Sequence, residues 1–300
     1  KSISLVVTPE HRMWVRRDVT KKGYSHVLAA DMLNDKKRAK KKRYRFLQRL
    51  KWDGGQPRSF SIPAYNPVYL GRGKGSPKVK DGFKKFPAEL WVRFMAWYLA
   101  EGCCRRYKVS NNGGSGYSIL ISQSEAHNPH HVREIKSILK KMGYKYNYYG
   151  MQFSLNSREL YEHLRQFGKS RDKFVPPEFK KMSARLAKLF VDTYVKGDGH
   201  TSPNGQRTIT SYSNKMLDDL QELSLKAGYW AVVDKKYHAV RLLKQRDALV
   251  SDQSHNGFGV RERAYKGRVY CVTVSTGIVL VRRRGKAVWC GNCYDDELNV

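Results

Sequence analysis

The chain has 300 residues, with 58 Lys and Arg against 26 Asp and Glu, so its formal net charge is +32 and its pI is near 10.0. This length allows two domains with ordinary cores, and a positive charge of this size indicates a polyanionic partner, nucleic acid first of all. We see no apolar run of membrane-spanning length and no signal peptide, and the five cysteines are an odd number. Reduced thiols in an intracellular, cytoplasmic setting therefore fit better than a disulfide framework, and we expect no membrane partner.

The N-terminal segment is predicted to be rich in strands. Apolar residues alternate from Ile3 to Val7, and Met13-Trp14-Val15 follows a turn at Pro9. Between these runs stands Thr8-Pro9-Glu10-His11, a Thr-x-x-His pattern that on its own usually carries no function. Residues 24–33 predict a short strand that leads into a helical turn.

A dense basic run extends from Lys36 to Arg45. Such a run can be a solvated stretch, but in so basic a chain we interpret it as an arm that contacts phosphates. The glycine-rich residues 71–77 do not match a nucleotide-binding loop, and we interpret them as a linker at a domain boundary.

Two apolar segments each end in an acid followed at once by glycine. The first ends at Glu101-Gly102 and the second at Asp198-Gly199. Both read as helices that stop at the acid, with the glycines in a left-handed conformation. Pro87 suits the first turn of the first helix, and Ser183 suits the N-cap of the second.

The two acids are in an unfavourable position, which implies a function. A carboxylate at a helix C-terminus costs a few tenths of a kcal/mol up to about 1 kcal/mol, so two of them imply a compensating cation. Small residues recur at a spacing of four on both helices (Ala96 and Ala100, Thr193 and Gly197). This spacing predicts that the helices pack closely and bring Glu101 and Asp198 side by side.

The elements after each helix are predicted to follow the same order. The first series has a strand over 117–122, a helix from Asn128-Pro129 to Met142, a hairpin near Gly150 and a helix that begins at Asn156. The second has a strand over 207–212, a helix over 215–227 and a hairpin that ends near 243. Polar and aromatic residues on the hairpins can reach base edges in a DNA groove, although the sequence leaves open which sheet face does so. They are Lys145, Asn147, Tyr149, Gln152, Lys235, Lys236, Tyr237 and Arg241.

Residues 83–250 resemble the LAGLIDADG homing endonucleases in their single-chain, pseudo-twofold form. Glu101 stands where Asp is more usual, but the carboxylate is kept. The resemblance implies that Glu101 and Asp198 bind Mg²⁺ or another divalent cation such as Mn²⁺ or Ca²⁺, and that a monomer cuts double-stranded DNA. The segment Lys173-Phe174-Val175-Pro176 is similar to one that supplies a catalytic lysine, and Lys244 is a candidate for a second lysine.

The C-terminal part is predicted to be rich in strands again, over 269–274, 278–281 and 287–289. It ends in Cys290-Gly291-Asn292-Cys293. A lone Cys-x-x-Cys can be half of a zinc site or a redox pair, but neither a second pair of suitable spacing nor a thioredoxin-like strand–helix unit accompanies it.

The two chain ends together resemble an intein, with Thr8 and His11 in its N-terminal block and Asn292-Cys293 at its C-terminal splice junction. The resemblance implies that His11, assisted by Thr8, activates the N-terminal bond, that Cys293 accepts the acyl group as a thioester, and that Asn292 cyclises. Splicing of this kind needs no cofactor. Gly291 stands where inteins usually carry histidine, so another group must assist the cyclisation. The first splicing nucleophile is expected upstream of the chain, which by itself is therefore not expected to splice.

Cys271 adds an alternative for the first step. A cysteine at this strand position, together with Trp14 after the Thr-x-x-His block, resembles a minority class of inteins in which the strand cysteine makes the first attack. The other possibility is an ordinary intein in which Cys271 only tunes the junction.

The sequence thus predicts an α+β protein in which a β-rich horseshoe (Hint) splicing domain, built from both ends, holds an inserted pseudo-twofold endonuclease of two αββαββα-like repeats. We place the first part of the splicing domain and the basic arm at 1–75, the endonuclease at 76–250, the second part of the splicing domain at 251–292 and host-protein (C-extein) residues at 293–300. The expected partners are a DNA target and the flanking exteins, in a microbial or phage host. The alternatives are a free-standing endonuclease or RNA maturase without splicing, and a basic binding module without enzymatic activity.

Overall fold

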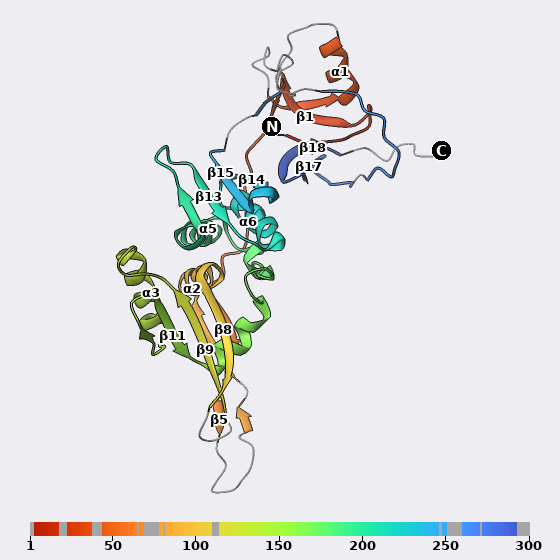
Figure 1. The fold of residues 1–300 in the computed structure, drawn as a ribbon. Coiled ribbons are helices and arrows are strands. Elements are labelled where there is room, and N and C mark those ends of the chain that lie inside the picture. Colours follow the sequence, from red (N-terminus) through yellow and green to blue (C-terminus); the bar gives the residue numbers. More distant parts are fainter. Residues whose placement is uncertain are drawn as a thin grey trace. The chain divides into compact units, whose positions relative to one another are not determined.

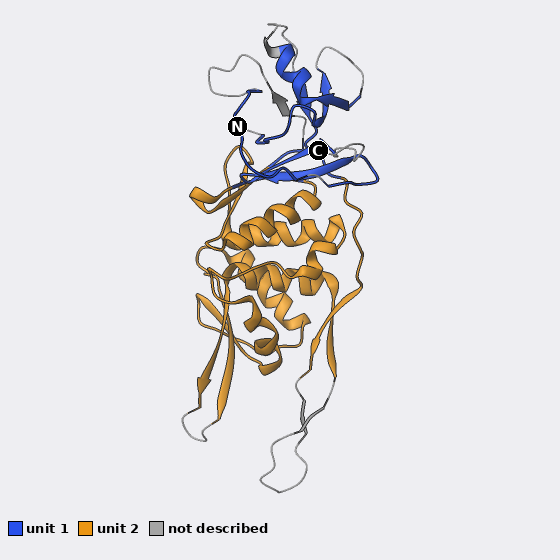
Figure 2. Cartoon of the chain, turned by 90° about the vertical axis from the view of Figure 1, so that its right-hand side faces the viewer, with its two compact units in different colours: residues 1–50, 229–233, 243–300 blue, residues 51–228, 234–242 orange. Residues whose placement is uncertain are grey.

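The computed structural model describes residues 3–17, 23–37, 44–64, 66–68, 78–80, 82–109, 114–245, 248–250, 260–270 and 272–292. The chain divides into two compact units, which Figure 2 shows in different colours. Unit 1 contains residues 1–50, 229–233 and 243–300, and unit 2 contains residues 51–228 and 234–242. Each unit is described by itself. No helix in the described ranges is both long enough and apolar enough to cross a membrane.

Unit 1 contains a four-stranded antiparallel sheet in the order β16-β3-β1-β2. Its strands are β1 (Arg12–Arg17), β2 (Ser25–Leu28), β3 (Tyr44–Phe46) and β16 (Ala248–Val250), and α1 (Ala29–Lys37) follows β2 directly. Alternate residues of β1 point into the core, where Met13 and Val15 pack with Val27, Phe46 and Val288. The strand and helical turn predicted over 24–33 are therefore present.

Residues 3–7 do not form the predicted strand. Ile3, Leu5 and Val7 instead pack as an irregular, partly buried segment against the core of unit 1. The strand predicted over 269–274 is also wrong for its described residues, which are irregular; Tyr270 is 84% exposed. Alternating apolar residues predict a strand only where one face is covered, and this segment has no such cover.

A second set of strands in unit 1 carries the C-terminal part. β17 (Ile278–Arg283) and β18 (Lys286–Gly291) form an antiparallel hairpin, and β18 also pairs with β14 (Trp230–Asp234) through Val232 and Lys286. Arg284 and Gly285 both have positive φ, as a two-residue hairpin turn requires. The predicted strands over 278–281 and 287–289 are present and slightly longer.

Unit 2 is built around α2 (Ala88–Glu101) and α5 (Ala184–Asp198), which Figure 1 shows next to each other. The antiparallel pair β4 (Ser59–Pro63) and β7 (Phe83–Pro87) leads into α2, with the short strands β5 (Asn66–Val68) and β6 (Lys78–Lys80) between them. Both helices end at their acids, as the sequence predicts.

The chain after α2 forms a four-stranded antiparallel sheet in the order β10-β11-β9-β8. Its strands are β8 (Gly102–Lys108), β9 (Ser115–Ser122), β10 (Asn147–Tyr148) and β11 (Gln152–Asn156), with α3 (Pro129–Lys141) between β9 and β10. α4 (Arg158–Leu164) and the 3-10 turns η1 (Arg165–Phe167) and η2 (Pro177–Lys181) then lead to α5. The sequence analysis missed β8.

The chain after α5 places β12 (Gly199–Thr201), β13 (Arg207–Thr210) and β15 (Ala239–Leu243) side by side. α6 (Asn214–Lys226) follows β13, and the 3-10 turn η3 (Lys235–Tyr237) precedes β15. The predicted mixed α and β architecture is confirmed.

Three local predictions about helix ends need correction. Pro87 is the N-cap of α2 and lies just before its first turn, and α4 is capped by Ser157, whose hydroxyl accepts from Leu160 N, and not by Asn156. Gly102 and Gly199 are extended, with φ of −98° and −129°, and not left-handed. Their physical role is steric, because a Cβ on Gly102 would lie 2.5 Å from the Tyr98 ring and one on Gly199 would lie 2.5 Å from Val195 O. Each strand leaves so close to the last helical turn that only glycine fits.

Candidate active site and nucleic-acid interface

The helices α2 and α5 lie against each other and run in the same direction. At their N-terminal ends Arg185 forms an ion pair with Glu89. At their C-terminal ends a Cβ on Gly197 would lie 2.7 Å from Ala100 Cβ and 3.0 Å from Glu101 Cγ, so the two backbones approach closely there. The small residues at the predicted spacing thus allow the contact that brings the two acids to one end of the helix pair.

The carboxyl groups of Glu101 and Asp198 are both partly buried at this end. Burial raises the pKa of Asp198 to about 6, although Lys173 and a 3.4 Å hydrogen bond from the Tyr194 hydroxyl act in the opposite direction. Burial also raises the pKa of Glu101, and repulsion from Asp198 adds to this effect. Two carboxylates that are desolvated and repel each other make a site that favours a cation.

Lys173 supplies one positive charge to this site. The side chain is only 7% exposed, and its ammonium group donates to the carbonyl oxygens of Leu99 and Gly102 at 2.9 and 2.8 Å, and to Tyr98 O at 3.3 Å. These are carbonyls at the C-terminal end of α2, where a cation is favoured by the helix dipole. Burial lowers the pKa of Lys173, while the charges of Asp198 and Glu101 raise it.

Two buried residues of the α6 region bind the backbone at Lys173 and two residues after it. Ser213, the N-cap of α6, donates its hydroxyl to Lys173 O at 2.6 Å and accepts from Met216 N at 3.1 Å. Asp219 accepts from Val175 N at 3.1 Å and also binds Lys180. The sequence analysis missed both residues, because a helix-capping serine and a helical aspartate have no distinctive sequence signal.

The sheet that follows α2 has one covered face and one open face. Ile119, Ile121, Phe153 and Leu155 are at most 1% exposed and lie on the covered face. The strand register places alternate residues on the open face, and most of them are polar. They include Cys103, Arg105, Tyr107, Ser122, Asn147, Gln152 and Ser154. The register thus shows which face of this sheet is open.

The sheet that follows α5 has the same division. Ile209 and Val240 are fully buried, while His200, Thr208 and Arg241 pair across β12, β13 and β15 on the other face. Because β8 starts right after Glu101 and β12 right after Asp198, the acid end of the helix pair lies where both sheets begin.

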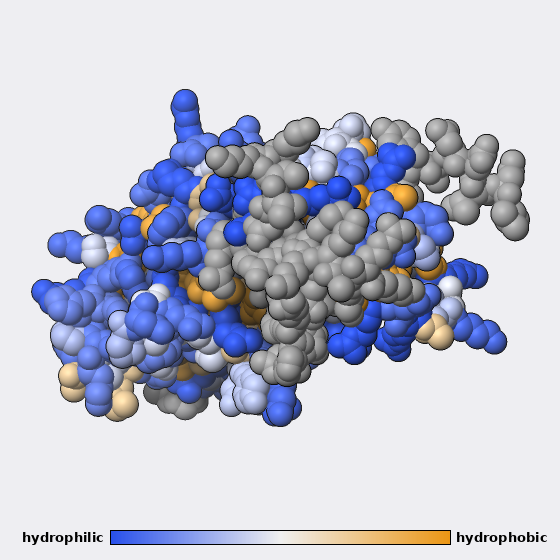
Figure 3. Space-filling model, turned by 90° about the horizontal axis from the view of Figure 1, so that it is seen from above, coloured by the Kyte–Doolittle hydropathy of each residue, from blue (hydrophilic) through white to orange (hydrophobic). Residues whose placement is uncertain are grey.

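The surface of the chain agrees with its composition. The face in Figure 3 is largely hydrophilic, with small hydrophobic areas between the polar side chains.

The predicted basic arm lies mostly outside the described residues: α1 ends at Lys37, and Tyr44 and Arg45 belong to β3.

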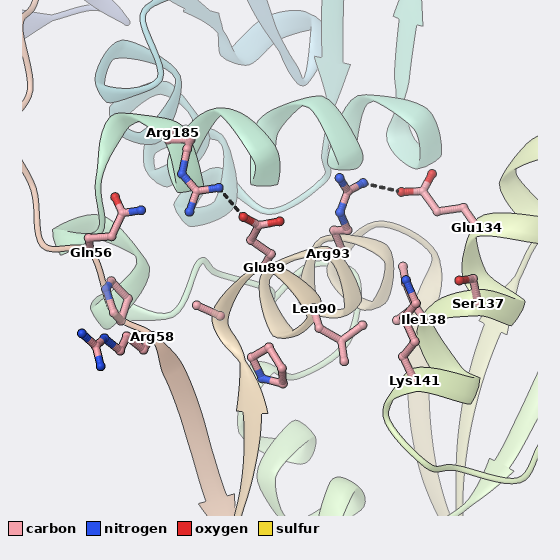
Figure 4. A pocket seen from close by; sticks show the side chains of 13 residues that line it. Gln56, Arg58, Glu89, Leu90, Arg93, Glu134, Ser137, Ile138, Lys141 and Arg185 are labelled. Carbon is pink, nitrogen blue, oxygen red and sulfur yellow. Dashed lines mark hydrogen bonds and ion pairs between the residues drawn. The ribbon is translucent and has the colours of Figure 1, made fainter.

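The N-terminal ends of α2 and α5 line a pocket of about 880 Å³, which Figure 4 shows. Its lining includes the ion pair of Arg185 with Glu89 and that of Arg93 with Glu134, at 3.0 Å. The pocket is at the opposite end of the helix pair from Glu101 and Asp198, so it belongs to a different surface.

The predicted splicing residues that the structure describes all lie in unit 1. His11 closes a turn that begins at Thr8: its backbone N–H donates to Thr8 O at 3.2 Å. Burial lowers the pKa of the His11 imidazole. Asn292 follows β18 and is 5% exposed. Its backbone N–H donates to Gly277 O at 3.1 Å. Cys271 and Cys293 lie outside the described residues, and Lys244 is an exposed residue of unit 1.

The segments that carry the two predicted splicing motifs lie close together within unit 1. A Cβ on Gly291 would lie 2.6 Å from Arg12 O and 2.8 Å from the Cδ2 atom of His26. Arg12 follows His11 and Gly291 precedes Asn292, so the two sequence motifs are neighbours in space although some 280 residues apart in sequence.

No family model matches the sequence. The chain is 20% identical, over an alignment of 348 positions, to a DNA-directed RNA polymerase subunit beta C-terminal section of Stigeoclonium helveticum, covering 97% of this chain and 31% of that protein. It is 22% identical over 247 positions to an ATP-dependent Clp protease proteolytic subunit of Chlamydomonas moewusii, covering 75% of this chain and 22% of that protein. The chain therefore spans about a third or less of these curated relatives.

Two solved structures are similar to about half of the chain. One is the homing endonuclease I-WcaI bound to its DNA recognition sequence, with 9% identity and a TM-score of 0.32 over 52% of this chain and 76% of that chain. The other is the I-LtrWI LAGLIDADG homing endonuclease bound to target DNA, with 11% identity and a TM-score of 0.30 over 54% of this chain and 78% of that chain. At these TM-scores the likeness is too distant to define the fold of this chain.

Proposed function

We propose that unit 2 is a DNA endonuclease of the LAGLIDADG homing type and that unit 1 is a protein-splicing domain in which it is inserted. The observation that carries the endonuclease is the pair Glu101 and Asp198 at the ends of two apposed helices, beside the open polar faces of two sheets. The net charge of +32 supplies the attraction to a polyanion. Double-stranded DNA is the ligand that this combination fits best.

The acid pair fits a hard divalent cation such as Mg²⁺. Both carboxyl groups have raised pKa values because burial disfavours their charged forms, and a bound cation would relieve this cost. The described ranges contain no group of three or more Asp, Glu, His or Cys side chains that could hold a metal ion. The remaining oxygen ligands would then be backbone carbonyls, water and a DNA phosphate. When bound, such an ion activates water and stabilises the leaving oxygen of the phosphodiester.

The protein itself supplies orientation and charge. Arg105 and Arg241, one on the open face of each sheet, would bind DNA phosphates. The sugar–phosphate backbone between these two contacts would then lie at Glu101 and Asp198. Lys173 would stabilise the negative charge that develops on the phosphate, and Tyr194 orients the Asp198 carboxyl.

The splicing part of the proposal starts from a different observation, the kinds of protein that this chain resembles. An RNA polymerase subunit and a protease subunit have no activity in common, yet this chain is similar to a minor portion of each. This is the pattern of an element inserted into unrelated hosts. The meeting of the Thr8–His11 turn with the Gly291–Asn292 end in unit 1 provides the neighbouring groups that peptide-bond rearrangement requires.

The endonuclease is tested with DNA selected for binding from a randomised duplex library. We expect the wild-type chain to cut the selected duplexes in Mg²⁺, and Glu101→Gln and Asp198→Asn to lose cleavage by at least about a thousandfold while they still bind, because neither acid attracts phosphate. Lys196→Met, which removes a charge from α5 close to Asp198, is the control. Wild-type cleavage rates in both acid variants would disprove the assignment.

A further inference from the structure

We infer that His26 is the proton-transfer group for the cyclisation of Asn292, a role that no sequence motif assigns to it. The inference rests on the proposed splicing function. It concerns one bond, the peptide bond between Asn292 and Cys293, and one imidazole, which β2 carries in the same unit.

The chemistry of this step requires a proton carrier. Nδ2 of Asn292 attacks the carbonyl carbon of the same residue, so an N–C bond forms and closes a succinimide ring. The C–N bond to residue 293 breaks, and one proton moves from Nδ2 to the nitrogen that leaves. An amide nitrogen is a weak nucleophile and an unprotonated amine leaves poorly, so both half-reactions need acid–base help. Imidazole suits both, because one of its two ring nitrogens can accept a proton while the other donates one.

One backbone oxygen places the imidazole beside Asn292. Gly277 O accepts from Asn292 N at 3.1 Å and lies 3.3 Å from His26 Nε2. The backbone of Asn292 and the ring of His26 therefore converge on the same atom. A Cβ on Gly277 would lie 3.7 Å from the Asn292 side-chain oxygen and 3.9 Å from His26 Cε1, so the amide and the ring also flank a common space.

The glycine before Asn292 is explained by the same ring. A Cβ at Gly291 would lie 2.8 Å from His26 Cδ2, in addition to its contact with Arg12 O at 2.6 Å. No side chain fits at residue 291, and the imidazole from β2 takes up the space next to it. The acid–base group that the neighbouring sequence lacks is thus provided by a residue about 265 positions earlier in the chain.

The ring is held in place yet open to proton exchange. Trp14 is the cross-strand partner of His26, and their ring centres are 5.0 Å apart with the planes inclined by 60°. His26 is exposed to solvent, whereas Asn292 is 5% exposed. A packed but solvent-accessible imidazole next to a buried amide can take a proton from one side and exchange it with water on the other.

The experiment measures cleavage at residue 292 in the full 300-residue chain. Mass spectrometry follows release of the peptide 293–300 and the succinimide at Asn292, in wild type, His26→Gln, His26→Ala and Asn292→Ala. We expect both His26 variants to slow release by about a hundredfold or more, the usual range for general acid–base catalysis, and imidazole added to His26→Ala to restore part of the rate. Glutamine can still donate to Gly277 O but cannot transfer a proton, so His26→Gln separates chemistry from structure.

The control is His238→Gln, because His238 also packs on an aromatic ring, that of Tyr212 at 5.2 Å, but belongs to unit 2. We expect this variant to release the peptide at the wild-type rate. A wild-type rate in His26→Gln, or an absence of rescue by imidazole, overturns the inference while the splicing proposal stands. If the wild type releases no more peptide than Asn292→Ala, the splicing proposal itself fails, and the inference fails with it.

Discussion

The ends of α2 and α5 carry the same short pattern, an acid followed by glycine, but their surroundings differ. At the end of α2, three backbone carbonyls bind the ammonium group of Lys173. At the end of α5, hydroxyl groups make the contacts: Thr210 donates to Asp198 O at 3.1 Å and Tyr194 donates to the carboxyl group at 3.4 Å.

The single positive charge of Lys173 acts on both Glu101 and Asp198. Lys173 lies close enough to lower the pKa of both Glu101 and Asp198, although only α2 binds it directly. The segment between the two halves of unit 2 thus supplies a cation to a site that both halves build, and the α6 end, through Ser213, keeps it there. Four experiments test whether the two helix ends differ in this way.

The largest effect is expected for Lys173→Met. This variant removes the charge and leaves buried carbonyls of α2 without their donor, so we expect cleavage to fall by about a hundredfold to a thousandfold and thermal stability to drop. Lys196→Met is the matched control, because Lys196 of α5 forms an ion pair with Glu134 of α3. Equal cleavage rates for the two variants would contradict a special role for Lys173.

The second prediction concerns pH. Because the pKa of Asp198 is raised from its ordinary 3.8 to about 6, this carboxyl gains a proton as the pH falls through about 6 and loses the charge that binds a cation. At limiting Mg²⁺ we expect the cleavage rate to fall about tenfold per pH unit below that point, and excess Mg²⁺ to move the midpoint lower because cation and proton compete. A cleavage rate independent of pH between about 7 and 4.5 would contradict the assignment, provided that circular dichroism shows the chain folded.

A smaller effect is expected for Ser213→Gly. Glycine is an adequate N-cap, so α6 should lose only a few tenths of a kcal/mol, but Lys173 O loses its buried donor. We expect cleavage to fall by roughly threefold to tenfold, and Ser213→Thr, which keeps the hydroxyl, to restore it.

Two controls test whether Ser213→Gly acts through Lys173. Ser157→Gly removes the equivalent cap of α4, whose hydroxyl accepts from Leu160 N and not from the Lys173 segment, and should leave cleavage unchanged. In a Lys173→Met background Ser213→Gly should cost nothing further, because its effect passes through that lysine. Additive losses in the double variant would show that Ser213 acts in another way.

The smallest effect is expected for Gly197→Ala, which adds one methyl group between α2 and α5. At an exposed helix position alanine is favoured over glycine by about 1 kcal/mol, but here its Cβ would press on Ala100 and Glu101. We expect the free energy of unfolding to fall by about 1–3 kcal/mol, measured by denaturant titration, and the acids to move apart. An increase in stability would show that α2 and α5 can separate at this point without cost.

The elements that depend on local rules could be predicted from the sequence. The two helices, their ends at Glu101 and Asp198, the Ser183 cap and the small-residue spacing follow from periodicity and capping, which depend on residues a few positions apart. The predicted left-handed conformation of Gly102 and Gly199 was wrong, since steric contact and not a positive φ requires glycine there.

The contacts between residues far apart in the chain could not be predicted and became visible in the folded structure. Ser213 and Asp219 bind the chain beside Lys173 across some 40 residues, and His26 lies next to Gly291 across about 265. Nothing near these residues in the sequence distinguishes them from ordinary capping or surface side chains, because their function comes from a contact and not from a pattern. The open face of each sheet was likewise settled only by strand register, which a shift of one residue would have reversed.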